Sequence, residues 1–239
     1  MNGPIKAVLF DLDGTLLDTA QDFHESLNQL RAEESLAPLD FETVRAQVSH
    51  GGHALVRLGF GALEPEAHET MRMRLLNIYR KRISKYTRLF EGGDEMLDAI
   101  EKRGLAWGIV TNKPGWLTDP LLIEVKLHDR VDAVVSGDTL SERKPHPMPL
   151  LHAAKTIGVE PGECVFVGDA ERDAQAAQAA GMYSLIAGFG YIGDNDRADE
   201  WFQHGWLNTP LELLDWLDKP SHALARAKNG KNATKNGSA

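Results

Sequence analysis

The feature that most constrains the fold is a series of short apolar runs separated by chain with the pattern of helices and loops. The runs lie at residues 5–10, 106–110, 131–135, 164–167 and 183–187. Short apolar runs that alternate with helices are typical of buried parallel strands joined by right-handed crossovers. We therefore predict an α/β fold with a Rossmann-like, mostly parallel sheet core and helices on both faces.

Amphipathic segments fill the spaces between these runs. The helices expected there lie at residues 93–103, 116–127, 148–157 and 173–180. Three of them are followed at once by a glycine, namely Gly104, Gly158 and Gly181. Glycine in this position is typical of a left-handed C-terminal cap, so each of these helices is expected to end there.

One connection is too long to be an ordinary crossover. Residues 16–89 contain no strand-like run, and a connection of this length is uncommon inside a compact domain. Its pattern predicts four helices, at residues 18–32, 41–49, 54–58 and 65–86. We predict an inserted α-helical cap domain over residues 18–87 and a core made of residues 1–17 and 88–218. A single larger α/β domain with additional helices is the alternative.

Charge and composition exclude several classes of function. The formal net charge of -9 disfavours general binding to nucleic acid or to an anionic membrane. No apolar stretch approaches the ~18 residues that suggest a membrane span. The N-terminus lacks the layout of a signal peptide and Cys164 is the single cysteine, so we expect a cytoplasmic protein. Residues 219–239 are predicted to be a disordered basic tail.

Polar side chains follow each of the first four runs. They are Asp11 and Asp13, then Thr111, Asn112 and Lys113, then Lys144, and finally Asp169 and Asp173. In open α/β sheets, ligands bind beyond the carboxyl ends of the strands. If the strands are parallel and adjacent, these groups converge on one edge of the sheet and form a site there.

The chemistry of such a site points to a cation and a phosphate. Clustered carboxylates repel one another, and Mg²⁺ suits their hard oxygen atoms, with Asp11 and Asp169 as the natural ligands. Lys144 and a threonine hydroxyl can hold the phosphate oxygens. An ionised Asp11 can attack phosphorus and form an acyl phosphate. Asp13 can protonate the leaving alkoxide and then deprotonate the attacking water.

The segments that carry these residues resemble the four motifs of the haloacid dehalogenase superfamily. They are FDLDGTLLDT, VTNKP, the lysine in SERKPHP, and GDAERD followed by AAGM, and the resemblance spans roughly residues 4–217. The helical insertion after the first motif resembles the α-helical cap of the branch with phosphoglycolate phosphatase and β-phosphoglucomutase. Residues 18–22, 111–114 and 190–192 resemble the phosphoglycolate phosphatase group, and GYIGDNDRADEW resembles its N-acetylmuramic acid 6-phosphate phosphatases.

The resemblance implies a role for each matched residue. Asp11 is the implied nucleophile, and Asp13 is the implied acid and base. The implied Mg²⁺ ligands are Asp11, Asp169 and, through its backbone carbonyl, Asp13. The residues implied to bind the transferring phosphoryl group are Thr111, Asn112 and Lys144. Asp173 is implied to orient Lys144 or the waters of the metal.

Residues of the cap are expected to select the substrate. Residues 49–53 have the pattern of a loop between helices, in about the place of the family's specificity loop. Gly51 and Gly52 allow a close approach to the active site, and we expect His50 or His53 to face the cleft. For Lys113, a substrate contact and solvent exposure are equally open.

We predict a Mg²⁺-dependent phosphatase that hydrolyses a small phosphorylated metabolite through an aspartyl-phosphate intermediate. The candidate substrates are 2-phosphoglycolate and N-acetylmuramic acid 6-phosphate, and neither nucleic acid nor a membrane is expected as a partner. The alternatives are a β-phosphoglucomutase-like phosphosugar mutase and a non-catalytic binding module. His24 argues against the mutase, because it lies one residue beyond the position of the mutase histidine, or about 100° around a helix. The sequence carries no signal of the oligomeric state.

Overall fold

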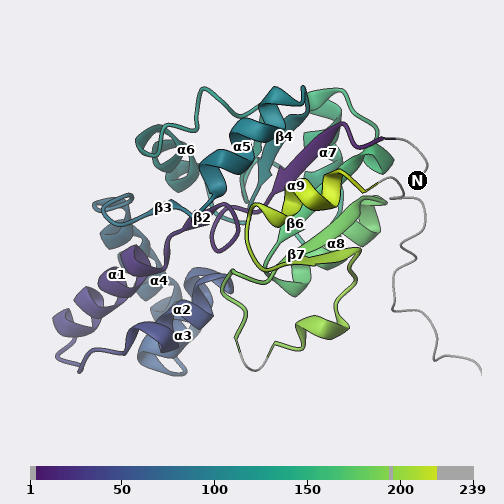
Figure 1. Cartoon of the computed structure of the whole chain (residues 1–239). Coiled ribbons are helices and arrows are strands. Elements are labelled where there is room, and N and C mark those ends of the chain that lie inside the picture. The colour runs from purple at the N-terminus through teal and green to yellow at the C-terminus, as the bar shows by residue number, and fades with distance from the viewer. Residues whose placement is uncertain (1–3, 194–195, 220–239) are drawn as a thin grey trace, which may run out of the picture.

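The computed structural model describes residues 4–193 and 196–219, and its centre is a parallel sheet (Figure 1). The strands are β1 (Ala7–Phe10), β4 (Ala106–Val110), β5 (Ala133–Val135), β6 (Cys164–Gly168), β7 (Tyr183–Ala187) and β8 (Gly205–Leu207). Their order across the sheet is β5-β4-β1-β6-β7-β8, and each neighbouring pair is parallel. The predicted α/β class is confirmed. Strand β8 was not predicted, because a run of three residues carries too little pattern.

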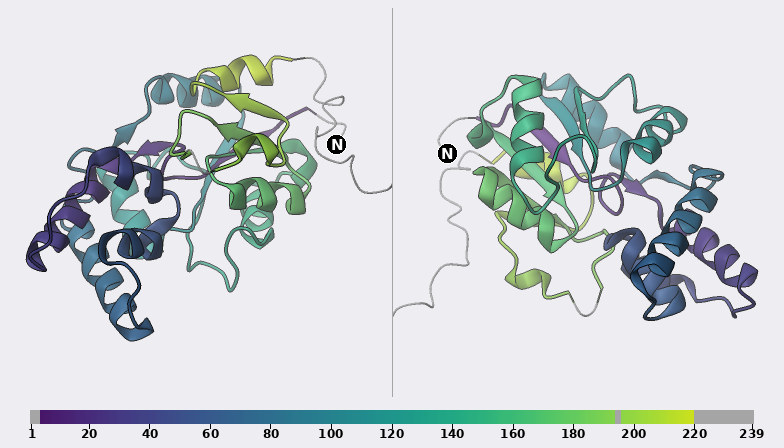
Figure 2. Two further views of the ribbon diagram at one scale, coloured as in Figure 1. Left: turned by 90° about the horizontal axis from the view of Figure 1, so that it is seen from below. Right: turned by 180° about the vertical axis from the view of Figure 1, so that it is seen from behind.

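Helices cover both faces of the sheet. Alternate residues of β1 point to opposite faces, and both sets are apolar, so each face packs against its own layer of helices. Val8 and Phe10 belong to the apolar cluster that includes residues of α5 (Gly93–Lys102), α6 (Gly115–Glu124) and α9 (Glu212–Leu217). Ala7 and Leu9 belong to the cluster that includes residues of α7 (Met148–Ile157) and α8 (Glu171–Ala180). The view from behind in Figure 2 shows α7 and α8 in front of the strands. Helix α9 was not predicted.

The long connection forms four helices, which lie beside the sheet as a separate group (Figure 1). They are α1 (Ala20–Glu33), α2 (Phe41–Val48), α3 (Gly51–Phe60) and α4 (Pro65–Arg80). We call residues Ala20–Arg80 the helical insert. The predicted helix at 65–86 is too long, since α4 ends at Arg80. The helix predicted at 54–58 is too short, since α3 begins three residues earlier.

Two short strands join the helical insert to the core. Strand β2 (Leu17–Asp18) pairs antiparallel with β3 (Arg88–Leu89). The expectation that residues 16–89 hold no strand is therefore wrong, because two residues are too few to show an alternating pattern. Of the proposed cap limits, residue 18 lies in β2 and residue 87 directly precedes β3. The tail predicted at 219–239 lies outside the described residues from position 220 onward.

Asp22 connects the beginning of the helical insert to the segment that leads from the insert back to the core. It lies in the first turn of α1 and is fully buried. Its carboxylate accepts hydrogen bonds from the backbone N–H groups of Tyr86 and Thr87, at 3.1 and 2.9 Å, and from the Thr87 hydroxyl at 2.7 Å. A buried carboxylate that binds several donors is costly to remove, because the donors then lose their acceptor.

We expect Asp22→Ala to lower the free energy of unfolding by about 2–4 kcal/mol, since it leaves buried N–H and O–H groups unpaired. Urea denaturation followed by circular dichroism measures this change. The comparison variant is Asp40→Ala, which removes the exposed N-cap of α2 and its bond with the Thr43 N–H at 2.9 Å. That loss should cost about 1 kcal/mol. Equal losses in the two variants would contradict the anchoring role of Asp22.

The sheet order determines where a ligand binds. From β1, which lies between β4 and β6, the chain runs through β4 to β5 on one side and then through β6 to β8 on the other. At such a switch point the connections leave in opposite directions and a crevice opens beyond the strand ends. Asp11 follows β1 directly and therefore lies at this crevice. Among the helices of the described residues, none has the length and apolarity that a membrane span requires.

Candidate active site

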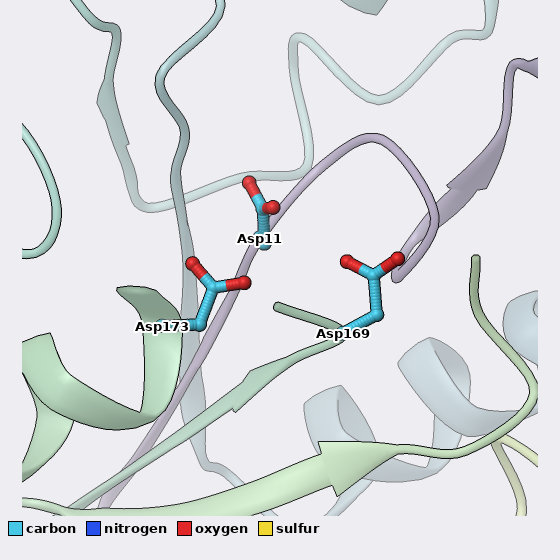
Figure 3. A group of neighbouring side chains, drawn as sticks. All are labelled: Asp11, Asp169 and Asp173. Atoms are coloured by element: carbon cyan, nitrogen blue, oxygen red, sulfur yellow. The ribbon is translucent and has the colours of Figure 1, made fainter. Parts of the chain in front are cut away.

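Three buried aspartates meet at the carboxyl ends of β1 and β6 (Figure 3). Asp11 follows β1, Asp169 follows β6, and Asp173 lies in the first turn of α8. Each is at most 2% exposed. One carboxylate oxygen from each residue lies within 4.8 Å of the others. Two segments far apart in the sequence, one after β1 and one after β6, thus place their acidic groups at a single point.

Two cations balance part of this negative charge. The Lys144 side chain is fully buried, and its Nζ lies 2.9 Å from Asp11 Oδ1 and 2.8 Å from Asp173 Oδ1. The same Nζ donates a hydrogen bond to the Val110 carbonyl at 2.6 Å. Arg172 Nη2 lies 3.8 Å from Asp11 Oδ2. Arg172 was not predicted, because an arginine in the first turn of a helix has no signal in the sequence that separates it from a solvated surface residue.

Burial and charge shift the pKa values of the aspartates in different directions. Burial alone would raise the pKa of Asp11, but the charges of Lys144 and Arg172 outweigh it and lower this pKa below 3.8. Burial, and then repulsion by Asp11 and Asp173, raises the pKa of Asp169 to about 7. Burial also raises the pKa of Asp173, against the attraction of Lys144. Asp11 is thus an ionised carboxylate, and the cluster keeps negative charge that Lys144 and Arg172 do not balance.

This cluster fits a divalent cation. Its donors are hard carboxylate oxygens, which suit Mg²⁺ and similar ions. The raised pKa of Asp169 shows where positive charge is lacking. A bound cation would supply that charge, and Asp11 and Asp169 are the residues placed to hold it.

Neighbouring groups fix the orientation of Asp169. Its Oδ1 accepts a hydrogen bond from the Thr15 hydroxyl at 3.2 Å, and its Oδ2 accepts from the Ser49 hydroxyl at 2.6 Å and from the Tyr191 N–H at 2.9 Å. Gly14 lies so close that a Cβ there would collide with Asp169 Oδ2. Ser49 comes from the helical insert, so the insert contributes directly to the acidic cluster.

Asp13 and Lys113 form a second ion pair near the cluster. Lys113 Nζ lies 2.8 Å from Asp13 Oδ1, and their side chains are 3% and 15% exposed. The Thr19 hydroxyl donates to the same oxygen of Asp13 at 2.7 Å. Of the two expectations for Lys113, solvent exposure is therefore wrong.

The three residues expected to bind phosphate all line one cavity with Asp11. Thr111 is 4% exposed, and its hydroxyl oxygen accepts a hydrogen bond from the Lys113 N–H at 3.2 Å. Asn112 donates through its side chain to the Lys144 carbonyl at 2.9 Å. This bond connects the segment after β4 with the segment that carries Lys144, and it places the two segments side by side.

The cavity has a volume of about 520 Å³ and lies between the core and the helical insert. The residues of segment 49–53 all line it, and they are Ser49, His50, Gly51, Gly52 and His53. The expectation that this segment is a loop is wrong for Gly51, Gly52 and His53, which form the first turn of α3, whereas Ser49 and His50 lie between α2 and α3 as expected. Glycines disfavour a helix interior, which is why the pattern indicated a break, but Gly51 takes a φ of +82° at the helix start.

The two histidines of this segment have different neighbours. His50 Nε2 lies 3.8 Å from Asp196 Oδ1, and the His53 ring stacks on His68 at 5.3 Å between centroids. His24 is not among the residues that line the cavity. Its Nε2 lies 3.0 Å from the Leu39 carbonyl, so this histidine is part of the packing within the insert.

Fold and site together define a class: α/β enzymes whose acidic site, suited to a divalent cation, lies at the switch point of a parallel sheet under a helical insert. The sequence matches the model of the haloacid dehalogenase-like hydrolases over residues 8–187. The chain belongs to this family, as its motifs predicted. Given the phosphatases among its relatives, it is an enzyme of the phosphoric monoester hydrolase class.

Curated relatives agree with this assignment, and a solved structure has a similar fold. The chain is 44% identical over 192 residues to a phosphoglycolate phosphatase of Xanthomonas campestris, covering 80% of this chain and 87% of the relative. It is 38% identical over 216 residues to an N-acetylmuramic acid 6-phosphate phosphatase of Pseudomonas aeruginosa, covering 90% and 96%. Its fold is similar to that of a predicted phosphoglycolate phosphatase from Haemophilus somnus, with a TM-score of 0.78, 24% identity, and coverage of 90% and 99%.

Proposed function

We propose that this hydrolase is a phosphatase that works with Mg²⁺ through a phosphorylated Asp11. The observation that carries the proposal is the environment of Asp11, a buried carboxylate with a lowered pKa, 2.9 Å from Lys144 and beside a cavity. An Asp11 oxygen attacks phosphorus while the bond to the ester oxygen breaks, and Asp13 gives that oxygen its proton. Asp13 then takes a proton from water, which attacks the same phosphorus and frees Asp11.

The residues proposed to hold Mg²⁺ are Asp11, Asp169 and the backbone carbonyl of Asp13. When bound, Mg²⁺ would neutralise charge on the phosphoryl group. Thr111, Asn112 and Lys144 are proposed to bind its remaining oxygens, and Asp173 holds the Lys144 ammonium at 2.8 Å. The helical insert is proposed to act as the cap that limits the entry of water.

We further propose that the substrate carries a second anionic group. Arg72 from the helical insert and Arg143 from the core line the cavity in addition to the residues that hold the phosphate. Burial, followed by the charges of Arg72 and, more weakly, Arg143, lowers the pKa of His53, so both cations act on the same part of the cavity. Arg72 pairs with Glu69 at 2.6 Å, whereas Arg143 forms no ion pair with any described residue. Both 2-phosphoglycolate and N-acetylmuramic acid 6-phosphate carry a carboxylate besides the phosphate.

Matched phosphate esters test this function. Phosphate release with Mg²⁺ is compared between 2-phosphoglycolate and 2-hydroxyethyl phosphate, and between N-acetylmuramic acid 6-phosphate and N-acetylglucosamine 6-phosphate. In at least one pair we expect kcat/KM for the ester that carries a carboxylate to be about 10–100 times higher than for the ester that lacks it. Arg143→Gln should reduce that ratio and leave p-nitrophenyl phosphate hydrolysis unchanged. Sugar isomerisation without phosphate release would favour the mutase, and a folded sample inactive on all esters would overturn the proposal.

We expect Mg²⁺ affinity to weaken below pH 7, because a proton and the cation compete for Asp169, whose pKa is raised by burial to about 7. Each pH unit below 7 should weaken apparent affinity about tenfold. Since this pKa lies above 3.8, the metal-free protein binds more protons than the unfolded chain and loses stability as pH rises from about 4 to about 7. Titration calorimetry and thermal unfolding at pH 6 and pH 8 measure both effects. Equal Mg²⁺ affinities at these pH values would contradict the assignment of Asp169.

A further inference from the structure

Lys113 belongs to the core, yet residues of the helical insert enclose its ammonium group. Its Nζ lies 4.8 Å from the ring centre of Phe23 in α1 and 4.5 Å from that of Tyr79 in α4. The two rings stack on each other at 4.0 Å. Nζ also lies 3.0 Å from the Tyr79 hydroxyl oxygen, to which it donates a hydrogen bond. Aromatic faces and a hydroxyl thus replace the water that this buried cation has lost.

Asp13 uses only one of its carboxylate oxygens in this arrangement. Its Oδ1 accepts hydrogen bonds from Lys113 Nζ at 2.8 Å and from the Thr19 hydroxyl at 2.7 Å. Two bonds use both lone pairs of that oxygen. No described residue donates a hydrogen bond to Oδ2, so Oδ2 is the oxygen left to exchange a proton with a substrate.

We propose that Lys113 is a positioning residue, which fixes the Asp13 carboxyl through Oδ1 so that Oδ2 transfers the proton. The proposal rests on the proposed function, in which Asp13 is the acid and base. Lys113 in turn keeps its place through Phe23 and Tyr79. The helical insert therefore contributes to proton transfer in the core without placing a residue of its own on the reacting atoms.

The surroundings of Lys113 argue against a direct substrate contact. An ammonium group has three hydrogens, and two of them are directed to Asp13 and to the Tyr79 hydroxyl. The stacked rings of Phe23 and Tyr79 also lie 4.8 and 4.5 Å from the group. A role in binding would raise KM when Lys113 is replaced, whereas a role in positioning Asp13 lowers kcat.

The test measures how the rate depends on the leaving group. An acid matters for an alkyl ester, whose leaving oxygen is strongly basic, and matters little for p-nitrophenyl phosphate, whose leaving group departs without a proton. For Lys113→Met we expect single-turnover phosphoryl transfer to fall about 10–100-fold with alkyl phosphates and less than about 3-fold with p-nitrophenyl phosphate. KM should stay within about 3-fold. Lys155→Met, a change on the exposed side of α7, is the matched control and should leave both rates unchanged.

Two further variants keep the outcome decisive. Tyr79→Phe removes only the hydroxyl, so it should stay folded and show a smaller change with the same preference for alkyl esters. Asp13→Asn should show the largest preference, and if it shows none, the proposed acid and base role itself fails. If Asp13→Asn shows the preference but Lys113→Met slows both ester types equally, or only raises KM, the inference on Lys113 alone is overturned.

Discussion

Asp11→Asn is expected to reduce phosphate release by about 10⁵-fold or more, because the amide cannot attack phosphorus as a carboxylate does. The protein should remain folded. Asp11 is one of three buried aspartates whose oxygens lie within 4.8 Å, so its replacement removes repulsion inside the cluster. Lys144 still retains Asp173, 2.8 Å from its Nζ, as a partner.

Two measurements check this expectation. Steady-state phosphate release gives the loss of kcat, and acid quenching after mixing with labelled substrate reports the covalent phosphoenzyme, which should form in the original enzyme and be absent from the variant. Thermal unfolding without Mg²⁺ should show one cooperative transition for the variant at pH 8, with a Tm no higher than that of the original enzyme, because the Asp11 carboxylate loses its attraction to Lys144 and Arg172. Activity within tenfold of the original enzyme would show that another group attacks phosphorus.

Lys144→Met is expected to damage both activity and stability. Lys144 is fully buried and lies within 3 Å of Asp11 and Asp173, so the change leaves two buried carboxylates without their shared cation. Breaking a buried ion pair in this way costs about 3–5 kcal/mol. Activity should fall by about 10³-fold or more, because the phosphoryl group loses a charged donor and the pKa of Asp11 rises.

A double variant separates these two effects. Asp173→Asn in the Lys144→Met background removes one of the unbalanced charges, so it should restore about half of the lost stability and none of the activity. Urea denaturation and phosphate release measure the two quantities. If Lys144→Met alone is as stable as the original protein, Lys144 does not balance the cluster.

The parallel sheet and its acidic edge could be predicted because the information is local. Each strand is a short apolar run, and residues such as Asp11 and Asp169 follow the runs directly. The carboxyl ends of adjacent parallel strands lie at one edge of the sheet, so residues that directly follow these strands in the sequence are expected to lie close together in space. The geometry of Asp11, Asp169 and Asp173 agrees with this reasoning.

Other features depend on contacts between distant segments, which no local pattern records. Arg172 differs from a surface arginine because buried aspartates face it, among them Asp11, which follows β1 and lies 3.8 Å away. Lys113 is buried because Phe23 and Tyr79 come from helices 90 and 34 residues away in the sequence. For α3, the glycines at its start conceal the beginning of the helix, since glycine more often interrupts helices than begins them.

The β2–β3 pair has a consequence for how such enzymes can diverge. Asp18 and Arg88 are direct partners in this pair, so the chain leaves the core and returns to it at one paired position. Residues 19–87 lie between these two partners and therefore take the place that the turn has in a β-hairpin. Its length and content can therefore change without moving the nucleophile. Replacement of this one module, by recombination or by protein engineering, would give Asp11 a new choice of metabolite, provided that the new module keeps the hydrogen bond that Ser49 donates to Asp169.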